Sequence, residues 1–310
     1  MMDQVIAVSG FTKRYGSAIA VDRLDFGLGR GEIFALLGPN GAGKTSTLEC
    51  IEGLRRADSG SIEVFGLDPV KDSGKLARRV GVQLQAQGLP GAMTVRETLG
   101  FFARYRGMDA GSGASAGLAS AERLGLGPKL GAQVSTLSTG QQRRLALALA
   151  IQHDPELVIL DEPTAGLDVE TRDELHAMMA GLRSEGKTIL LATHDMAEAE
   201  KLADRALVLV AGKRAAEGSP RELTSQGEGR TRISVSTSHN VFLLRRPELP
   251  AAESLPGEGA YAMYRSADPA ATLSALLSCL AASGDELLDL RVERPSLEER
   301  FLEIVGRRPA

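Results

Sequence analysis

The chain has 310 residues, of which 43% are hydrophobic and 25% are charged, and its formal net charge is −4. This length suits one large domain with a smaller one, and the negative charge gives no global positive field that would favour a nucleic-acid partner. The two cysteines, Cys50 and Cys279, lie far apart and lack metal-ligand spacing, which suits reduced thiols in a reducing compartment.

The N-terminal segment predicts a strand and not a targeting signal. Residues 1–11 include the acidic Asp3 and no basic lead-in, unlike a secretory signal peptide. Apolar runs such as Leu157–Leu160 have the length of strands and fall well short of the roughly 20 residues that span a bilayer. We therefore expect no membrane-spanning segment in this chain.

Short apolar runs alternate with helical patterns as far as about residue 218. Because near-continuously apolar strands alternate with helices, we expect an α/β fold with a parallel sheet that is covered on both faces. The expected strands are Val5–Val8, Ile33–Leu37, Ser61–Phe65, Val80–Leu84, Leu157–Asp161, Ile189–Thr193 and Ala206–Val210. The expected helices are Lys44–Leu54, Val95–Arg106, an amphipathic Gln141–His153, Val169–Glu185 and Met196–Leu202.

A mainly helical stretch interrupts the strand pattern at about residues 86–153 and predicts an inserted helical subdomain. Inside it, Ala110–Ala119 is rich in Gly, Ser and Ala, and we expect a loop or a loose helix start there. We expect the first domain, with this insertion, to cover residues 1–220.

After Pro220 the sequence becomes polar and contains glycines (Ser225–Gly229), and new strand and helix patterns follow. This change predicts a second, small α+β domain over residues 221–310. Its expected elements are the strand Thr231–Ser236, a proline-rich loop with Pro247, Pro250 and Pro256, the strand Ala260–Arg265, the helix Pro269–Ala282, the strand Glu286–Val292 and the helix Leu297–Val305.

The most specific motif is Gly38–Thr45, directly behind the apolar run Ile33–Leu37. It has the spacing G-x-x-x-x-G-K-[ST] and lies between an expected strand and an expected helix. Its glycines let successive backbone N–H groups point at phosphate oxygens, and the helix start adds the positive end of its dipole. Lys44 can reach the β- and γ-phosphates of a triphosphate, while the Thr45 hydroxyl can ligate Mg²⁺. The motif therefore predicts a site for a nucleoside triphosphate.

A phosphate loop alone allows kinases, GTPases, recombinases and transport ATPases. Neither of the two asparagines, Asn40 and Asn240, starts an N-K-x-D segment, so guanine-specific recognition has no candidate. Two acids, Asp161 and Glu162, follow the apolar run Leu157–Leu160. Asp161 can hold Mg²⁺ through water and Glu162 can accept a hydrogen bond from an attacking water. Taken alone, two acids after a strand are equally compatible with a solvated loop or a helix cap.

Leu137–Gln141 precedes a long helix and gives a second helix start that suits an anion. The Ser138 hydroxyl and the first backbone amides can bind a phosphate or simply cap the helix. Because a chain with one phosphate loop has a second such start, we expect two copies to meet, each closing the other's nucleotide. With these motifs together, residues 3–220 resemble the ATP-binding-cassette (ABC) ATPases. The resemblance implies a P-loop NTPase fold with an inserted helical subdomain, to which the small C-terminal α+β domain is added.

The resemblance also implies roles for individual positions. Leu137–Gln141 matches the signature segment, and Ala165–Asp168 matches the loop that crosses to the partner cassette, where Asp168 is also a good helix N-cap. His194 matches the switch histidine that touches the γ-phosphate, although a lone histidine after a strand is usually structural. The implied catalytic residues are Glu162, His194, Lys44 and Gln85, and the implied metal-binding residues are Thr45, Gln85 and Asp161. The implied ATP-binding residues are Tyr15, Gly38, Pro39, Asn40, Gly41, Ala42, Gly43, Lys44, Thr45, Ser46, Ser138, Thr139, Gly140, Gln141 and Asp168.

Two of these positions leave alternatives open, and a third departs from the pattern of the family. Gln85 matches the glutamine that links Mg²⁺ and the attacking water to the membrane partner, with Gln83 and Gln87 as competitors. Tyr15 occupies the position where the family stacks an aromatic ring on adenine, or it merely precedes a turn glycine. Thr139 stands where a glycine is usual, so its methyl and hydroxyl groups lie near the expected partner phosphate.

The C-terminal segment Pro295–Leu302 looks like the P-[ST]-L-E-x-x-F-L ending of drug-resistance-type exporters, the daunorubicin-resistance-like group. In purely physical terms it is a helix with a capping box of Ser296 and Glu299 and an apolar face that includes Leu297 and Phe301.

The resemblance as a whole implies an ATPase that uses ATP and Mg²⁺ and forms a homodimer in the ATP-bound state. It would drive export of a drug or lipophilic compound through a separately encoded transmembrane subunit, at the cytoplasmic face of the membrane. The alternative is a soluble ABC ATPase of the iron–sulfur assembly or cell-division type, and such proteins usually lack a C-terminal domain of this kind.

Overall fold

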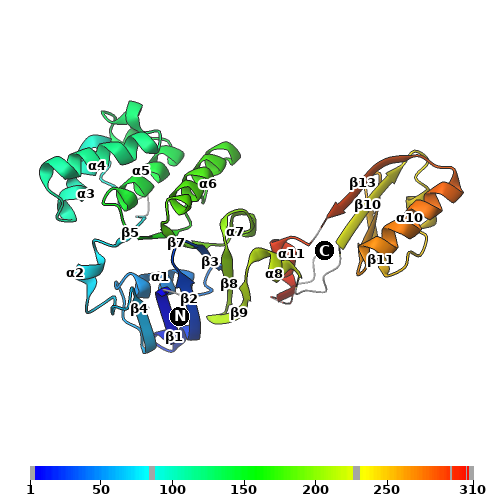
Figure 1. The fold of residues 1–310 in the computed structure, drawn as a ribbon, viewed down its shortest axis with the longest axis horizontal. Helices are drawn as coiled ribbons and strands as arrows, with labels where there is room; N and C mark the ends of the chain where they lie inside the picture. The colour runs from blue at the N-terminus through cyan, green and yellow to red at the C-terminus, as the bar shows by residue number, and fades with distance from the viewer. Residues whose placement is uncertain (1–3, 84–87, 226–230, 294, 305, 307–310) are drawn as a thin grey trace. The chain divides into compact units, whose positions relative to one another are not determined.

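The computed structural model describes residues 4–83, 88–225, 231–293, 295–304 and 306 (Figure 1). The chain divides into two compact units, residues 1–219 and residues 220–310. Each unit has a hydrophobic core of its own. The predicted catalytic residue Gln85 and its competitor Gln87 lie outside the described residues.

A six-stranded sheet forms the centre of the first unit, in the order β5-β6-β7-β3-β8-β9. Its first five strands are parallel and β9 is antiparallel at one edge. Every residue of β3 and β7 is buried, as the continuous apolar runs of a sheet covered on both faces require. The predicted parallel sheet is therefore confirmed. Its strands are β3 (Ile33–Leu37), β5 (Val80–Val82), β6 (Leu157–Asp161), β7 (Thr188–Thr193), β8 (Arg205–Val210) and β9 (Lys213–Gly218).

A second, antiparallel sheet contains β1 (Gln4–Tyr15), β2 (Ala18–Gly29) and β4 (Ser59–Val64) in the order β2-β1-β4. The sequence prediction was wrong here, because it assigned Val5–Val8 and Ser61–Phe65 to the parallel sheet and did not expect β2. All three strands mix buried residues with exposed ones. A strand with one solvated face gives a weaker apolar signal than a strand buried on both faces.

Helices cover the parallel sheet, and three of them, α3 to α5, form a helical subdomain between β5 and β6 in the chain (Figure 1). Alternate residues of β7 enter two different cores: Leu190 packs with α1 and the antiparallel sheet, whereas Leu191 packs with the helical subdomain and α6. The helices of this unit are α1 (Lys44–Ile51), α2 (Ser73–Leu76), α3 (Val95–Tyr105), α4 (Ala110–Arg123), α5 (Thr139–Ile151), α6 (Val169–Ser184) and α7 (Met196–Leu202).

The glycine-rich segment Ala110–Ala119, expected as a loop or loose helix start, lies in the regular helix α4. A Cβ atom at Gly113 would lie 2.8 Å from the Cβ atom of Ala103 on α3, and one at Gly117 would lie 3.1 Å from the Cβ atom of Leu99. Glycine costs about 1 kcal/mol in a helix interior relative to alanine. Close packing of the two helices, which only glycine permits at these positions, offsets this cost.

The helix α5 was expected to be amphipathic, and this prediction was wrong for its second half. Every residue from Leu145 to Ile151 is buried. Because α3, α4, α6 and the strand β5 surround this half of the helix, it has no solvated face.

The second unit is a four-stranded antiparallel sheet in the order β11-β12-β10-β13, with α10 packed on one face. Leu276 of α10 shares a buried core with Ile233 and Tyr264 of the sheet. The predicted capping box is confirmed: Glu299 donates its backbone N–H to Ser296 Oγ at 3.2 Å, and its carboxylate accepts from the N–H of Ser296. The elements are α8 (Pro220–Ser225), β10 (Thr231–Thr237), α9 (Val241–Arg245), β11 (Ala252–Glu258), β12 (Tyr261–Ser266), α10 (Pro269–Ser283), β13 (Leu287–Glu293) and α11 (Leu297–Ile304).

The expected proline-rich loop of this unit was only partly right, because it contains the short helix α9 and the strand β11. Pro256 lies within β11, which is an edge strand. Proline is tolerated at a sheet edge because its missing N–H faces away from the neighbouring strand.

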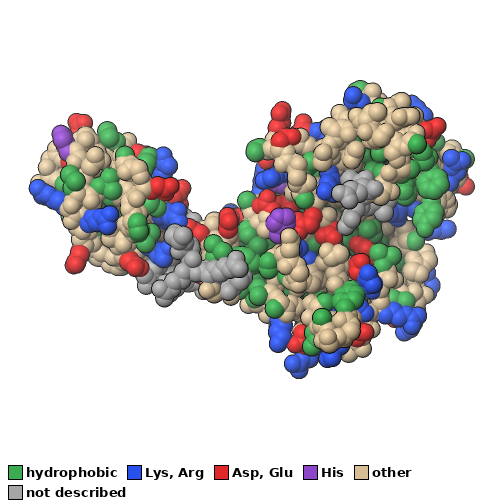
Figure 2. All heavy atoms as spheres, turned by 180° about the vertical axis from the view of Figure 1, so that it is seen from behind, with side chains coloured by type: hydrophobic (Ala, Val, Ile, Leu, Met, Phe, Trp, Pro, Cys, Tyr) green, Lys and Arg blue, Asp and Glu red, His purple; other side chains and the backbone are tan. Residues whose placement is uncertain are grey.

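Among the described residues, no helix has both the length and the apolar character needed to cross a bilayer. Acidic and basic side chains both occur over the visible face of each unit (Figure 2), in keeping with the small net charge of −4. Neither finding contradicts the composition-based expectations.

Candidate active site

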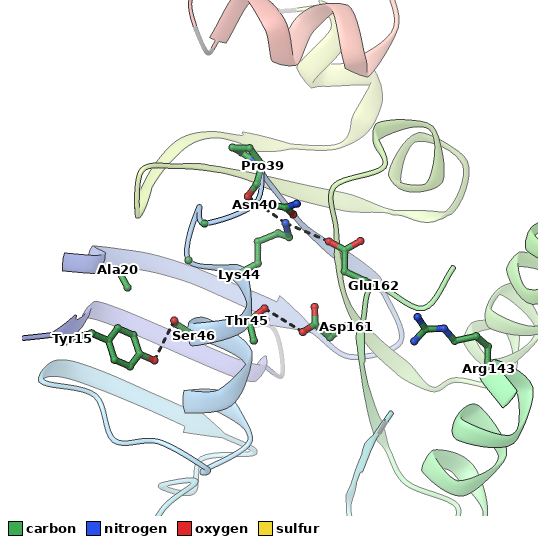
Figure 3. A pocket seen from close by; sticks show the side chains of 12 residues that line it. Tyr15, Ala20, Pro39, Asn40, Lys44, Thr45, Ser46, Arg143, Asp161 and Glu162 are labelled. Carbon is green, nitrogen blue, oxygen red and sulfur yellow. Dashed lines mark hydrogen bonds and ion pairs between the residues drawn. The ribbon is translucent and has the colours of Figure 1, made fainter. Parts of the chain in front are cut away.

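The strand order brings three sequence-distant segments to one edge of the parallel sheet. Because β7 lies between β3 and β6, Leu37 is in register with Thr193, and Asp161 is in register with Ala192. These strands therefore bring the loop after β3, the acids at the end of β6 and His194 after β7 side by side. They lie at the carboxyl ends, where α/β sheets bind ligands. A pocket of about 520 Å³ lies there (Figure 3). It is lined by Tyr15, Ala20, Pro39, Asn40, Gly41, Gly43, Lys44, Thr45, Ser46, Arg143, Asp161 and Glu162.

The loop between β3 and α1 can exist only with glycine at two of its positions. Gly43 has φ 103°, and a Cβ atom there would lie 2.5 Å from the carbonyl oxygen of Ala20. A Cβ atom at Gly38 would lie 2.4 Å from the carbonyl oxygen of Leu209. No side chain caps α1, and its first residues, Lys44, Thr45 and Ser46, line the pocket. The N–H groups of an uncapped helix start suit an anion.

Lys44 is held beneath this loop, with only 6% of its surface exposed. Its Nζ donates to the carbonyl oxygen of Gly38 at 2.7 Å and lies 3.4 Å from Oε1 of Glu162. The hydrogen bond and the ion pair compensate for the burial of the ammonium group. The cation is therefore fixed between the backbone of this loop and the carboxylate of Glu162.

Glu162 has a backbone conformation that is rare for a residue with a side chain, with φ 48°. Its N–H donates to the carbonyl oxygen of Ala192 at 2.9 Å, which anchors it to β7. Its Oε2 lies 2.6 Å from Nδ1 of His194. Such left-handed residues cost free energy and are concentrated at functional sites. Here the conformation places the carboxylate between Lys44 and His194.

Asp161 and Thr45 offer oxygen ligands for a divalent cation. The Thr45 hydroxyl donates to Oδ2 of Asp161 at 3.2 Å, while Oδ1 of Asp161 is buried without a partner among the described residues. Burial raises the pKa of Asp161, and the negative charge of Glu162 raises it further. Burial also raises the pKa of the nearby Glu52 to about 7, with added repulsion from Asp161 and Glu49. A cation placed among these carboxyls would relieve both effects.

This donor set fits Mg²⁺, which takes one or two protein oxygens and completes its shell with phosphates and water. Within the described residues, no group of three or more His, Cys, Asp or Glu side chains could hold a metal ion. A dedicated all-protein metal site is thus absent from that part of the chain, whereas a site shared with a triphosphate is compatible with Thr45 and Asp161.

Tyr15 lies at the end of the pocket opposite Arg143 (Figure 3). Its hydroxyl lies 3.3 Å from the Ser46 hydroxyl, and the residue is 39% exposed. The charged groups of Lys13 and Arg55 lie 5.5 and 5.4 Å from the ring centroid. An exposed ring held in this way is suited to stacking on a base.

The signature segment and Asp168 do not line the pocket of their own chain. Ser138 caps α5 in a capping box with Gln141, and Asp168 caps α6 by accepting from the N–H of Thr171 at 2.9 Å. Ser138, Thr139 and Asp168 are exposed to solvent. The expected helix caps are therefore confirmed, and the side chains expected to bind phosphate face outward.

Two pocket residues, Ala20 and Arg143, were not expected from the sequence. Ala20 belongs to β2, which was not predicted. Arg143 follows the signature segment by two residues, and its basic charge was the available signal. Gln83, the competitor of Gln85, is buried, and its amide has no partner among the described residues.

By its fold and by the conformation of this loop, the molecule is a P-loop nucleotide hydrolase. Comparison with known proteins narrows the class. The sequence pattern of the family described as "ABC transporter" matches residues 21–165. The "Nod factor export ATP-binding protein I" of Paraburkholderia xenovorans is 39% identical, over 99% of this chain and 99% of its own. The protein of the same name from Mesorhizobium japonicum is 38% identical, over 96% of this chain and 86% of its own.

Solved structures agree with the sequence comparison. The cassette cbiO1 from Clostridium perfringens, part of an ABC transporter complex, has 28% identity and a TM-score of 0.66, and covers 72% of this chain and 92% of its own. A dimeric bacterial ABC transporter cassette has 24% identity and a TM-score of 0.63, and covers 69% of this chain and 98% of its own. The chain belongs to the ABC transporter family, as an ATP-binding subunit. Its activity is that of an ABC ATPase, in which ATP hydrolysis is coupled to transport.

Proposed function

We propose that this chain is the ATP-hydrolysing subunit of an exporter and drives efflux of a drug or another lipophilic compound. It would act at the cytoplasmic face of the membrane, through a separately encoded membrane subunit. The observation that carries the proposal is likeness over the whole chain to proteins named for export, at 96–99% coverage, including the second unit. The Pro295–Leu302 ending, similar to that of drug-resistance exporters, supports the choice of cargo class.

The site would be completed by a second copy of the chain. Ser138, Gly140 and Asp168 lie away from the pocket of their own chain, and Ser138 and Asp168 are exposed. The solved cassette that is described as dimeric shares this fold. Two copies facing each other would let the first turn of α5 in each chain close on the nucleotide of the other, with its N–H groups toward the phosphate.

Each side chain of the pocket would then have a separate task in hydrolysis. The loop amides and Lys44 bind the β- and γ-phosphates, and Tyr15 stacks on adenine. Thr45 and Asp161 would hold Mg²⁺, which supplies positive charge to the phosphate oxygens. Glu162 accepts a hydrogen bond from the attacking water, a role worth about 10²–10⁴ in rate. His194 orients that carboxylate and faces the γ-phosphate.

Loss of the γ-phosphate would remove the group that bridges the two chains, so that they separate. ATP binding would therefore close the pair of chains and hydrolysis would open it. This movement would perform work on the membrane subunit. The chemistry needs positioning and charge neutralisation more than a covalent intermediate.

The test is reconstitution of the purified chain in vesicles with a candidate membrane subunit. We expect ATPase activity that rises when a cargo compound is added, and ATP-dependent loss of that compound from the compartment that holds the chain. A chain that does not associate with any membrane subunit and hydrolyses ATP alone would contradict export. That result would favour the soluble ABC ATPases of iron–sulfur assembly or cell division.

A further inference from the structure

Arg143 lines the pocket but has none of the roles in ATP hydrolysis proposed for the other pocket residues. It belongs to the second turn of α5, in the helical subdomain, and lines the same pocket as Lys44, Thr45, Asp161 and Glu162. In Figure 3 its guanidinium group extends from α5 toward these carboxylates. It is thus a second cation at the phosphate end of the pocket, supplied by a different part of the fold.

Within the described ranges of the chain, the side chain of Arg143 has no hydrogen bond or ion pair, and its Nε atom is buried without a partner. The next residue, Arg144, ion-pairs with Glu174. The carboxylate of Glu162 is already engaged by Lys44 and His194. A partly buried guanidinium without an acceptor is costly, so an anionic partner from outside the chain is the economical explanation.

The place of Arg143 selects which part of a nucleotide it could reach. Tyr15 and Ala20 lie at one end of the pocket and Arg143 lies at the other, beyond Asp161 and Glu162 (Figure 3). With the base at Tyr15, the chain of phosphates runs toward Arg143. Its planar fork of N–H donors matches phosphate oxygens in pairs, which a lysine cannot reproduce.

We propose that Arg143 binds the terminal phosphate of the ATP held by its own chain. This inference rests on the proposed roles of the pocket. Because α5 also carries the signature segment at its first turn, the contact ties the position of that segment to the presence of the γ-phosphate within the same subunit. ADP, which lacks this phosphate, leaves the guanidinium without its ligand and the helix without this restraint.

The test uses the full chain with Arg143→Gln, Arg143→Lys and the matched control Arg144→Gln, which removes the same charge one residue further along α5. Binding of ADP and of the imido analogue of ATP is titrated with Mg²⁺, at protein concentrations where light scattering shows a monomer. Thermal unfolding of each variant is recorded in parallel.

For Arg143→Gln we expect about 10-fold weaker binding of the ATP analogue or more, from loss of a charge-assisted contact, with unchanged binding of ADP. Arg143→Lys should recover part of the loss, and Arg144→Gln should leave the ratio of the two affinities unaltered. Equal effects on both nucleotides, or no effect on either, would overturn the role of Arg143. Failure of the unmodified chain to bind either nucleotide would instead overturn the proposed function.

Discussion

Oε2 of Glu162 lies 2.6 Å from Nδ1 of His194, while its other oxygen, Oε1, lies 3.4 Å from Nζ of Lys44. One carboxylate therefore joins the cation beneath the phosphate loop to the imidazole at the end of β7. The three residues are far apart in the chain. They meet because β6, β7 and β3, the strands that precede them, are neighbours in the sheet. The charge of Glu162 can be removed with little change in shape, which makes it the natural first target.

Glu162→Gln should bind ATP about as well as the unmodified chain and hydrolyse it at least 10²-fold more slowly. A neutral amide cannot polarise the attacking water or take its proton as a carboxylate does. The ATP-bound pair should then accumulate. Phosphate release and light scattering measure the two effects, and Glu156→Gln, on a surface carboxylate that pairs with Arg79, is the control. Near-normal turnover in Glu162→Gln would contradict the role of Glu162 in activating the attacking water.

Ser138→Ala separates the role of the signature segment from its role as a helix cap. Ser138 on α5 and Thr94 on α3 both form complete capping boxes. Replacing either by alanine should lower the free energy of unfolding by about 1 kcal/mol. In the Glu162→Gln background, only Ser138→Ala should also weaken ATP-dependent pairing, by about 10-fold, since it loses a contact to the partner's phosphate.

Sedimentation with ATP, together with denaturant unfolding of each variant, measures both quantities. Equal loss of pairing in Ser138→Ala and Thr94→Ala would mean that the serine only caps its helix.

His153 should make the first unit less stable in mild acid. Its ring is partly buried, and Nε2 lies 3.1 Å from the guanidinium of Arg106. Burial, and then the charge of Arg106, lowers the pKa of His153 from 6.5 to about 4. Between these values the unfolded chain binds more protons than the folded chain, so the free energy of unfolding falls as pH decreases from 6.5 and this contribution levels off near 4.

Because the ring is only partly buried, the loss is on the order of 1 kcal/mol. His153→Gln, which does not titrate, should show a shallower fall over the same range in denaturant titrations. Parallel pH profiles for the two proteins would show that His153 is not responsible.

Tyr264→Phe should leave the second unit as stable as before or stabilise it by up to about 1 kcal/mol. The ring is 1% exposed, and its hydroxyl has no hydrogen-bond partner in the described part of the chain. Burial raises the pKa of Tyr264 to about 12. Leu276→Ala, in the same core, should cost about 2–5 kcal/mol. Unfolding curves compare the two variants, and a loss above about 1 kcal/mol in Tyr264→Phe would reveal a partner for its hydroxyl.

The elements that sequence reasoning located well are those whose signal is local. The short continuous apolar run Leu157–Leu160 is typical of a buried strand, and the predicted bounds of β3, β6 and α7 match the structure. The phosphate loop and the Asp161–Glu162 pair are also contiguous motifs. Their convergence at one sheet edge follows from the parallel arrangement.

The elements that it missed depend on contacts between distant segments. Nothing near Gly113 or Gly117 indicates a helix, because the stabilising partner is α3 and the requirement is for a short distance between backbones. The strand β2 includes Asp22 and Asp25 on a solvated face, and aspartate is uncommon in strands. Pairing with β1 stabilises the strand in spite of these residues. Arg143 could not be assigned to the pocket without knowing that the second turn of α5 faces it.

The glycine contacts between α3 and α4 also bear on how the subunit transmits force. Where Cβ atoms would approach to 2.8 and 3.1 Å, no layer of flexible side chains separates the two backbones. Because the backbones are in such close contact, the two helices resist sliding past each other and move as one rigid unit. A push applied to α3 is therefore passed on to α4 without loss in an intervening layer of side chains.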